Sequence, residues 1–324
     1  MTLLAFTRPL IKTLMKSKKK YNGLVVPSIT PLTHNYKLDH EAVEKIFDNI
    51  FNYGGVPFIL GTTGESASLS YELKLDFIKL AASIRQPGRL LYAGISSNCL
   101  ADSIDLAKRC ADEGIDVAVA HLPAYFTLTE YEIKTYFETL ANEVPIPLIV
   151  YNIPATTNVS INLNLLDELS HHENIVGTKD SERNHERLKD SLKLWAHRQD
   201  FSHFLGWGAQ SAHALFTGSD GLVPSTGNLF PDIYYKMIVA ADNNDEAAAL
   251  QLQRHSNLIG DIYQGKRLLG ESLAALKSLM QSAGLCRTYM MPPLLQVSEA
   301  EAADLQKKLQ RMLNVENLSL PIYQ

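Results

Sequence analysis

The residue best suited to covalent chemistry in this 324-residue chain is a lysine at the end of an apolar run. The run is IVGTKD at residues 175–180, and the two-residue period of a β-strand puts Ile175, Gly177 and Lys179 on one face. An ammonium among apolar walls loses hydration, so its pKa falls and a neutral amine becomes available to attack a carbonyl carbon. The pattern leaves a second interpretation open, in which Lys179 pairs with Asp180 or extends to solvent.

A tyrosine ends a second apolar run, PLIVY at residues 147–151. The strand period places Tyr151 on the same face as Ile149, and a phenol there can carry a proton to or from a substrate. Tyrosines at strand ends are also common in cores, with the hydroxyl hydrogen-bonded. The acid–base role of Tyr151 therefore depends on the neighbouring strand carrying Lys179.

Small residues form a third candidate element, the turn GTTGES at residues 61–66. Its backbone N–H groups and the hydroxyls of Thr62 and Thr63 are suited to a carboxylate or a phosphate. The turn lacks the Gly-Lys-Ser/Thr ending of a nucleotide-binding loop, which disfavours ATP and GTP. Glycine-rich turns at residues 206–208 and 218–221 either open room for a ligand or only reverse the chain.

Short apolar or β-branched runs alternate with segments of helical period, and this rhythm is typical of a parallel α/β fold. Eight such units favour a closed (β/α)8 TIM barrel over an open doubly wound sheet, since no Gly-rich nucleotide turn follows the first strand. The predicted strands span residues 23–28, 56–60, 90–93, 117–120, 147–151, 175–179, 203–206 and 221–224.

The helices between these strands have recognisable start signals. Asp39 is placed to cap a helix whose apolar residues, within 43–51, recur every three or four positions. Thr129 and Glu132 have the spacing of a capping box. Because the reacting groups of such barrels stand at the C-terminal ends of the strands, the fold would bring the three candidate segments together.

We predict three parts in the chain: an N-terminal extension at residues 1–20, the barrel at 21–230, and a C-terminal helical region at 231–324 packed on the barrel. The extension is basic and weakly amphipathic, so it is either a solvated segment or a contact for a membrane or a partner. In the C-terminal region, Ser298 and Glu301 predict a capping box before a helix ending near Leu313.

Composition excludes several classes of function. With 30 basic and 35 acidic residues the net charge is −5, which does not suit a general nucleic-acid binder. No apolar run approaches the roughly 18 residues of a membrane span, so we expect no membrane partner and a cytoplasmic protein. Cys99, Cys110 and Cys286 form no C-x-x-C pair and are expected to be inert buried thiols in a reducing compartment. The sequence also lacks the H-E-x-x-H and G-x-S-x-G motifs, so neither a catalytic metal nor a serine nucleophile is expected.

Four segments together give the chain a resemblance to a known family. They are GTTGES at 61–66, YNIP at 151–154, GTKD at 177–180 and GSDG at 218–221. Over residues 21–313 the chain resembles the dihydrodipicolinate synthase and N-acetylneuraminate lyase family of pyruvate-dependent class I aldolases.

The resemblance implies roles for the candidate residues. Lys179 would form a Schiff base with the keto carbon of a 2-keto acid, and Tyr151 would relay protons. Thr62 and Thr63 would bind the carboxylate of the keto acid, and Thr62 would also belong to the catalytic residues. The iminium is an electron sink that stabilises an enamine when a bond at C3 breaks. No metal or organic cofactor is implied.

Further site residues and a partner also follow from the resemblance. Tyr125, in PAYF at residues 123–126, matches a relay tyrosine that the family often supplies across a subunit interface. Gly208 and Val223 match substrate-binding positions after the seventh strand and at the eighth. A homo-oligomer, a dimer or a tetramer, is therefore expected.

One departure bears on the substrate. The lysine-pathway synthases of the family carry an arginine five residues after the relay tyrosine, where it grips a carboxylate, and this chain has Thr156. The stretch STGN at 225–228 offers hydroxyl and amide groups that suit a polyhydroxylated substrate. The leading hypothesis is cleavage of a 2-keto-3-deoxy sugar acid or a sialic acid to pyruvate and an aldehyde.

Other functions stay open. The enamine can instead expel hydroxide, which makes the enzyme a dehydratase, and 4-hydroxy-tetrahydrodipicolinate synthesis is a less favoured alternative. A non-catalytic keto-acid-binding protein would be expected to lack Lys179 or Tyr151, and both are present. A sugar-phosphate isomerase needs a catalytic glutamate, for which Glu65 is poorly placed after the second strand.

Overall fold

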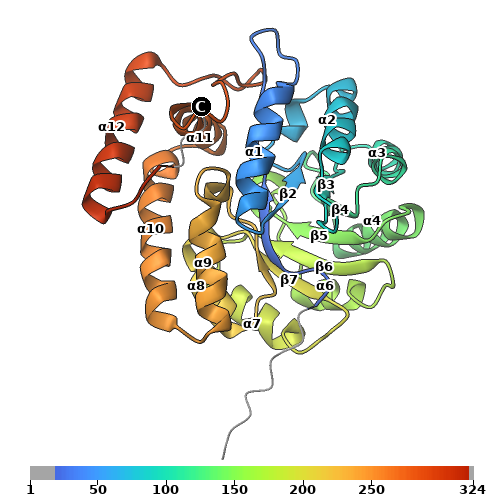
Figure 1. Cartoon of the computed structure of the whole chain (residues 1–324). Helices are drawn as coiled ribbons and strands as arrows, with labels where there is room; N and C mark the ends of the chain where they lie inside the picture. The colour runs from blue at the N-terminus through green and yellow to red at the C-terminus, as the bar shows by residue number, and fades with distance from the viewer. Residues whose placement is uncertain (1–18, 321–324) are drawn as a thin grey trace, which may run out of the picture.

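The computed structural model describes residues 19–320 and forms a closed barrel of parallel strands (Figure 1). Each strand pairs with its neighbours in chain order, and β8 pairs with β1 to close the ring. The eight predicted strands and the (β/α)8 fold are thus confirmed. The strands are β1 (Gly23–Pro27), β2 (Val56–Ile59), β3 (Tyr92–Gly94), β4 (Val117–His121), β5 (Leu148–Asn152), β6 (Ile175–Asp180), β7 (Ser202–Leu205) and β8 (Gly221–Leu222).

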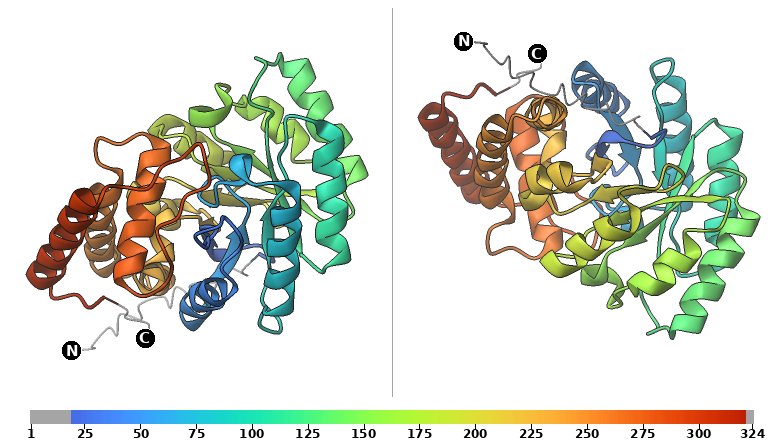
Figure 2. Two further views of the ribbon diagram at one scale, coloured as in Figure 1. Left: turned by 90° about the horizontal axis from the view of Figure 1, so that it is seen from above. Right: turned by 90° about the horizontal axis from the view of Figure 1, so that it is seen from below.

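Helices surround the barrel, as the views from above and below show (Figure 2). The α-helices are α1 (His40–Asn52), α2 (Tyr71–Ser83), α3 (Leu100–Asp112), α4 (Glu130–Glu143), α5 (Pro154–Thr157), α6 (Leu163–Leu169), α7 (His185–Trp195), α8 (Ser211–Thr217), α9 (Pro231–Asp242), α10 (Glu246–Gln264), α11 (Leu269–Ser282) and α12 (Glu299–Glu316). Short 3₁₀ turns are η1 (Ser66–Ser68), η2 (Gly208–Gln210) and η3 (Ser225–Asn228).

Helix starts follow the signals in the sequence. The Asp39 side chain accepts a hydrogen bond from the N–H of Ala42 at the start of α1. Thr129 and Glu132 form the reciprocal capping box of α4. In α12, Ser298 accepts from the N–H of Glu301, but the Glu301 carboxylate pairs with Arg267 instead of completing the box.

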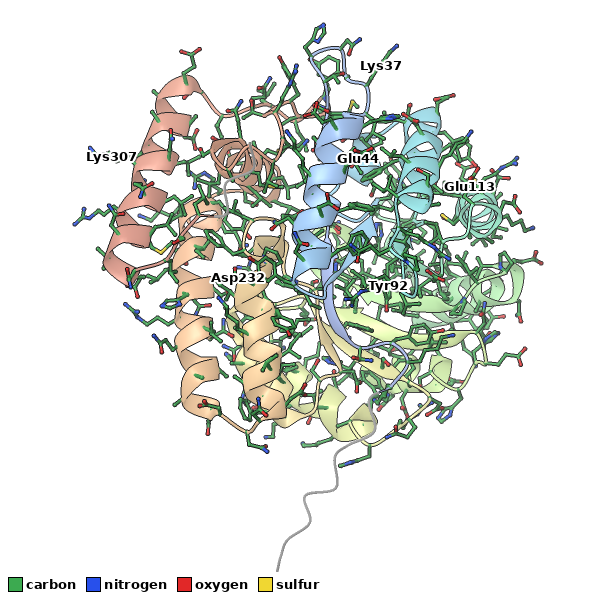
Figure 3. All side chains as sticks on the ribbon, in the orientation of Figure 1. Lys37, Glu44, Tyr92, Glu113, Asp232 and Lys307 are labelled. Atoms are coloured by element: carbon green, nitrogen blue, oxygen red, sulfur yellow. The ribbon has the colours of Figure 1, made fainter. Side chains whose placement is uncertain are left out.

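Strand residues alternate between two apolar environments. One buried cluster lines the barrel interior; it comprises Tyr21, Val25, Phe58, Tyr92, Val117, Val119, Ile149, Tyr151, Ile153, Phe204 and Val223. The residues between them pack outward against the helices in a larger cluster. In Figure 3, Tyr92 lies within the barrel, Glu113 lies outside it at the end of α3, and Lys307 lies on α12 of the C-terminal helices. Because the interior is filled by side chains, a ligand is expected only at the C-terminal mouth.

The helices from α9 to α12 lie on one side of the barrel, beside α1 and α8 (Figure 1). Within this group, α10 packs against α8 and α9 and also contacts α11 and α12. The prediction that the C-terminal part is helical agrees with these elements.

A buried lysine lies at the floor of the barrel, the end opposite the C-terminal mouth. The Lys19 ammonium lies 2.7 Å from Asp220 Oδ2 and donates to the carbonyls of Phe201 and Trp195 at 2.8 and 3.2 Å. Lys19 therefore belongs to the barrel floor and not to a solvated segment. The rest of the predicted extension, residues 1–18, lies outside the described residues.

Some predicted details are corrected. The strand predicted at residues 221–224 ends at Leu222, because the chain turns into η3 directly after Pro224. The fourth strand runs one residue beyond its predicted end, to His121. Cys110 and Cys286 are buried as expected, but Cys99 is exposed just before α3. Among residues 19–320, no helix has the length and hydropathy needed to cross a bilayer.

Candidate active site at the barrel mouth

Lys179 lies on the interior face of β6, among aromatic rings. Its Nζ is 3.8 Å from the centroid of the Tyr151 ring and 4.9 Å from that of Phe58. Burial lowers the pKa of Lys179, an effect that the Tyr151 phenol opposes. Within the described chain no carboxylate lies at ion-pair distance from this ammonium, in contrast to the other buried lysines. The amine is therefore set up to lose its proton and act as a nucleophile.

Asp180, which the sequence left open as a partner for Lys179, points to the other side of the strand. Its carboxylate accepts hydrogen bonds from Arg187 Nε at 2.6 Å and from the Asn152 side chain. Arg187, at the start of α7, also donates to the carbonyl of Ile161. This buried network fixes the end of β6 without neutralising Lys179.

The hydroxyl of Tyr151 is held by a residue that the sequence analysis did not single out. Ser181 Oγ donates to the Tyr151 hydroxyl oxygen at 3.3 Å. A Cβ at position 206 would stand 2.0 Å from this Oγ, so a larger residue there would displace the Ser181 hydroxyl. Gly206 thus leaves room for Ser181 beside Tyr151.

The turn at residues 61–66 follows β2 at the same end of the barrel. Thr63 is buried and Thr62 is partly exposed. A Cβ at Gly61 would lie 3.0 Å from the ring of Phe58, the ring that also borders Lys179. The turn is therefore packed against the same aromatic wall as the lysine.

Glu65, at the end of this turn, takes part in a buried ion pair that the sequence did not predict. Its carboxylate lies 2.5 Å from Lys277 Nζ on α11, and both side chains are fully buried. The second Glu65 oxygen accepts from the N–H of Met291, while Lys277 also donates to the carbonyl of Tyr289. The C-terminal helices thus anchor the turn that carries Thr62 and Thr63.

Two further predicted positions lie near the mouth. Val223 belongs to the interior cluster that contains Tyr151. Gly208 begins η2 after β7, and its carbonyl accepts hydrogen bonds from Ser211 and from Gln253 of α10.

The stretch 225–228 does not offer the free polar groups expected of it. The hydroxyls of Ser225 and Thr226 both bond to the Tyr263 hydroxyl, at 2.7 and 2.9 Å. Asn228 accepts from the N–H of Ile29 and donates to the carbonyl of Pro27. These side chains join α10 and β1 to η3, so they are not evidence for a polyhydroxylated substrate.

Tyr125 lies on the surface of the single chain. Its side chain is 80% exposed, and its ring contacts that of Phe126, which is also exposed. Thr156, the residue that departs from the synthase pattern, lies in α5 just after β5 and is partly exposed.

His121 is a site-facing residue that the sequence analysis missed. In β4 it follows Val117 and Val119 at two-residue intervals, so it shares their interior face. Strand pairing sets His121 opposite Tyr151, which in turn lies opposite Lys179. Extending the predicted fourth strand by one residue beyond Ala120 would have revealed it.

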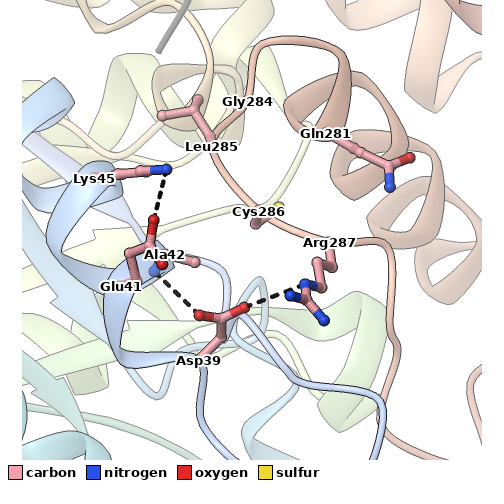
Figure 4. Close-up of a pocket in the computed structure, with 9 residues that line it drawn as sticks. All are labelled: Asp39, Glu41, Ala42, Lys45, Gln281, Gly284, Leu285, Cys286 and Arg287. Atoms are coloured by element: carbon pink, nitrogen blue, oxygen red, sulfur yellow. Dashed lines mark hydrogen bonds and ion pairs between the residues drawn. The ribbon is translucent and has the colours of Figure 1, made fainter. Parts of the chain in front are cut away.

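Potential metal ligands and a surface pocket elsewhere on the chain bear on the choice of site. Searching residues 19–320 gives no group of three or more His, Cys, Asp or Glu side chains arranged to hold a metal ion. A surface pocket of about 330 Å³ lies between the start of α1 and the segment after α11 (Figure 4). Its charged groups pair with one another, Asp39 with Arg287 and Glu41 with Lys45, and Lys179 does not line it.

Comparison with known proteins agrees with this geometry. The sequence pattern of the Dihydrodipicolinate synthetase family matches residues 20–312. The chain is 28% identical over 291 residues to a protein of Escherichia coli (strain K12) named "Probable 2-dehydro-3-deoxy-D-pentonate aldolase", covering 88% of this chain and 95% of that one. It is 27% identical over 303 residues to the 4-hydroxy-tetrahydrodipicolinate synthase of Aquifex aeolicus (strain VF5), covering 93% and 99%.

A solved structure gives the same result. The dihydrodipicolinate synthase of Bacteroides thetaiotaomicron superposes with a TM-score of 0.86 at 29% sequence identity, covering 91% of this chain and 99% of that one. The barrel, its helical region and their order along the chain are therefore shared with proteins of this kind.

Proposed function

The chain belongs to the dihydrodipicolinate synthetase family and is a Schiff-base-forming class I lyase, and we propose that it cleaves a 2-keto-3-deoxy sugar acid or a sialic acid to pyruvate and an aldehyde. The observation that carries this proposal is Lys179, buried between the rings of Tyr151 and Phe58 with no carboxylate partner in the described chain. A lysine in this environment is suited to forming an imine with a keto carbon.

In the proposed reaction, the neutral Lys179 amine attacks C2 of the keto acid, and loss of water gives an iminium. The C4 hydroxyl then loses its proton, the C3–C4 bond breaks, and its electron pair moves into the enamine while C4 leaves as an aldehyde. Protonation at C3 and hydrolysis release pyruvate and the free amine. Tyr151, its hydroxyl held by Ser181, is positioned to carry these protons, and Thr62 and Thr63 to bind the carboxylate.

The substrate class rests on two supports. Thr156 stands where the synthases carry a carboxylate-binding arginine, which argues against 4-hydroxy-tetrahydrodipicolinate synthesis. The relative in Escherichia coli carries the name of an aldolase for a 2-keto-3-deoxy pentonate. The hydroxyl and amide groups at 225–228 do not count among the supports, because they are committed to bonds within the fold.

Rival functions are less well supported. A dehydratase would use the same imine and differ only in the leaving group, so product analysis separates it from an aldolase. A non-catalytic binding protein would have no need for the buried amine. A sugar-phosphate isomerase would need an accessible glutamate, whereas Glu65 is fully buried against Lys277.

We also propose that the working enzyme is a homo-oligomer, a dimer or tetramer, in which a second copy covers Tyr125 and completes the relay. The exposed rings of Tyr125 and Phe126 support this, because large apolar rings that lie together on a surface are often covered by a partner. A cytoplasmic location is proposed from the three free cysteines, which suit a reducing compartment.

Borohydride trapping tests the proposed function. The protein is incubated with pyruvate, reduced, digested, and mapped by mass spectrometry. We expect a reduced pyruvyl adduct on Lys179 and none on exposed lysines such as Lys193, with 2-keto-3-deoxy sugar acids then yielding pyruvate and an aldehyde. Absence of the adduct in folded protein with several 2-keto acids would refute the Schiff-base mechanism, and an adduct without turnover would indicate a binding protein.

A further inference from the structure

His121 is fixed in the mouth of the barrel by three hydrogen bonds. Its backbone N–H donates to Ser96 Oγ at 2.8 Å, and its carbonyl accepts from the Tyr136 hydroxyl at 3.4 Å. Its ring Nδ1 lies 2.7 Å from the carbonyl oxygen of Leu122. Because a carbonyl can only accept, the proton of the neutral ring is on Nδ1, and Nε2 keeps its lone pair.

Tyr151 lies between the His121 ring and β6. The two rings meet edge to face with centroids 6.1 Å apart, and Lys179 Nζ lies over the Tyr151 ring at 3.8 Å. The register of β4, β5 and β6 places all three side chains in one row across the barrel interior. A substrate bound covalently to Lys179 and lying over Tyr151 would therefore extend toward His121.

The surroundings of the imidazole favour its neutral form on balance. Burial lowers the pKa of His121, and the nearby Lys179 lowers it further, while the bond to Leu122 opposes these effects. An iminium on Lys179 would carry the same positive charge and act in the same direction. The ring can thus serve as a hydrogen-bond acceptor at neutral pH and is partly exposed to the mouth.

We propose that His121 is a specificity-determining residue whose Nε2 accepts a hydrogen bond from a hydroxyl group on the part of the substrate that leaves as the aldehyde. This inference rests on the proposed function and deepens it, because it names a group on the protein that distinguishes hydroxylated aldehydes from plain ones. A site built to hydrogen-bond a hydroxyl discriminates strongly against the analogue that lacks it, since its buried acceptor is then left without a partner.

The test uses the reaction in the direction of condensation. Wild type, His121→Leu and His121→Gln are each given pyruvate with glyceraldehyde, which carries hydroxyls, or with propionaldehyde, which carries none. We expect the ratio of kcat/KM for glyceraldehyde over propionaldehyde to fall at least about tenfold in His121→Leu, the effect of losing one hydrogen bond of about 1.4 kcal/mol. His121→Gln, which keeps an acceptor oxygen, should restore part of the ratio.

Two controls keep the outcomes distinct. Borohydride trapping of pyruvate on Lys179 should proceed in His121→Leu within about twofold of wild type, which also shows that the variant folds. His171→Leu, a change at an exposed histidine after α6, should leave the ratio unchanged. If trapping succeeds but the aldehyde ratio is the same in wild type and His121→Leu, the role of His121 is refuted; if wild type forms no adduct, the proposed function itself fails.

Discussion

Residues 19–320 contain three buried lysines, and comparing the barrel mouth with the two structural sites shows how the surroundings of Lys179 differ from those of the other two. Lys19 at the floor and Lys277 behind the 61–66 turn each contact a buried carboxylate, Asp220 and Glu65 respectively. Lys179 has aromatic rings in place of a carboxylate. Burial is common to all three lysines, so the partner is what differs: a carboxylate pairs with the ammonium of Lys19 and of Lys277, whereas burial without a carboxylate lowers the pKa of Lys179.

The sharpest test of this comparison removes the lysine that lacks a carboxylate. Lys179→Met should lower turnover by about 10⁴-fold or more and abolish the pyruvate adduct. It should also raise the thermal stability at pH 7, because wild type must bury a group whose charged form is disfavoured. Since the folded pKa of Lys179 is below its usual value of 10.5, this cost is present at lower pH and disappears as the pH rises toward 10.5.

The pH series of unfolding midpoints measures this directly. The stability difference between Lys179→Met and wild type should be smaller at pH 10 than at pH 7. A variant that is less stable than wild type at pH 7 would mean that Lys179 has a stabilising partner after all.

Breaking the pair behind the turn should produce the next largest effect. Glu65→Gln leaves the Lys277 ammonium buried without its carboxylate, and we expect a loss of about 3–5 kcal/mol in the free energy of unfolding. The double variant Glu65→Gln with Lys277→Met should recover part of this loss, because no charge then remains buried. Urea unfolding measures both, and equal losses in the single and double variants would contradict a charge-based explanation.

Lys19, at the barrel floor, should contribute somewhat less to the free energy of unfolding. Lys19→Met removes the ion pair and two bonds to carbonyls, but Asp220 keeps the hydrogen bond that it accepts from the N–H of His203. We expect a loss of about 2–4 kcal/mol in the free energy of unfolding with the rate of adduct formation on Lys179 unchanged. A parallel loss of adduct formation would show that floor and mouth are coupled.

The effect that is smallest at neutral pH concerns acid sensitivity at the floor. Burial, together with the charges of Lys19 and Arg187, lowers the pKa of His203 to about 3. The unfolded chain therefore binds a proton at His203 below about pH 6.5 that the folded chain does not, so stability should fall with decreasing pH by up to about 1.4 kcal/mol per unit. In His203→Phe this slope should be flatter between pH 6 and pH 4, and an unchanged slope would assign the acid sensitivity elsewhere.

The sequence predicted the central pair of the site because both residues obey the period of two within strongly apolar strands. Lys179 and Tyr151 end such runs, and the closed barrel does bring β5 and β6 together. His121 was not predicted as a site residue because strand ends are the least predictable part of a strand pattern. A difference of one residue decided whether the histidine belonged to the fourth strand.

Other features depend on contacts between distant parts of the chain. Ser225 and Thr226 have side chains that suit a sugar, and only the position of Tyr263 on α10 shows that they are already bonded. In the same way, nothing local to Glu65 indicates that Lys277 will meet it. Residue type predicts what a group can do, whereas tertiary partners decide whether it is available.

The closure of the barrel also sets the order of events while the chain is being made. The carboxylate that pairs with Lys19 belongs to Asp220, 201 residues later in the chain. In the same part of the barrel, β1 pairs with β8 through only two residue pairs. At about 5–20 residues per second, the ribosome needs about 10–40 s to reach Asp220 after Lys19 has been made. During that interval the edge of β1 that β8 will cover has no strand beside it, and such an unpaired edge is a template for pairing with another chain.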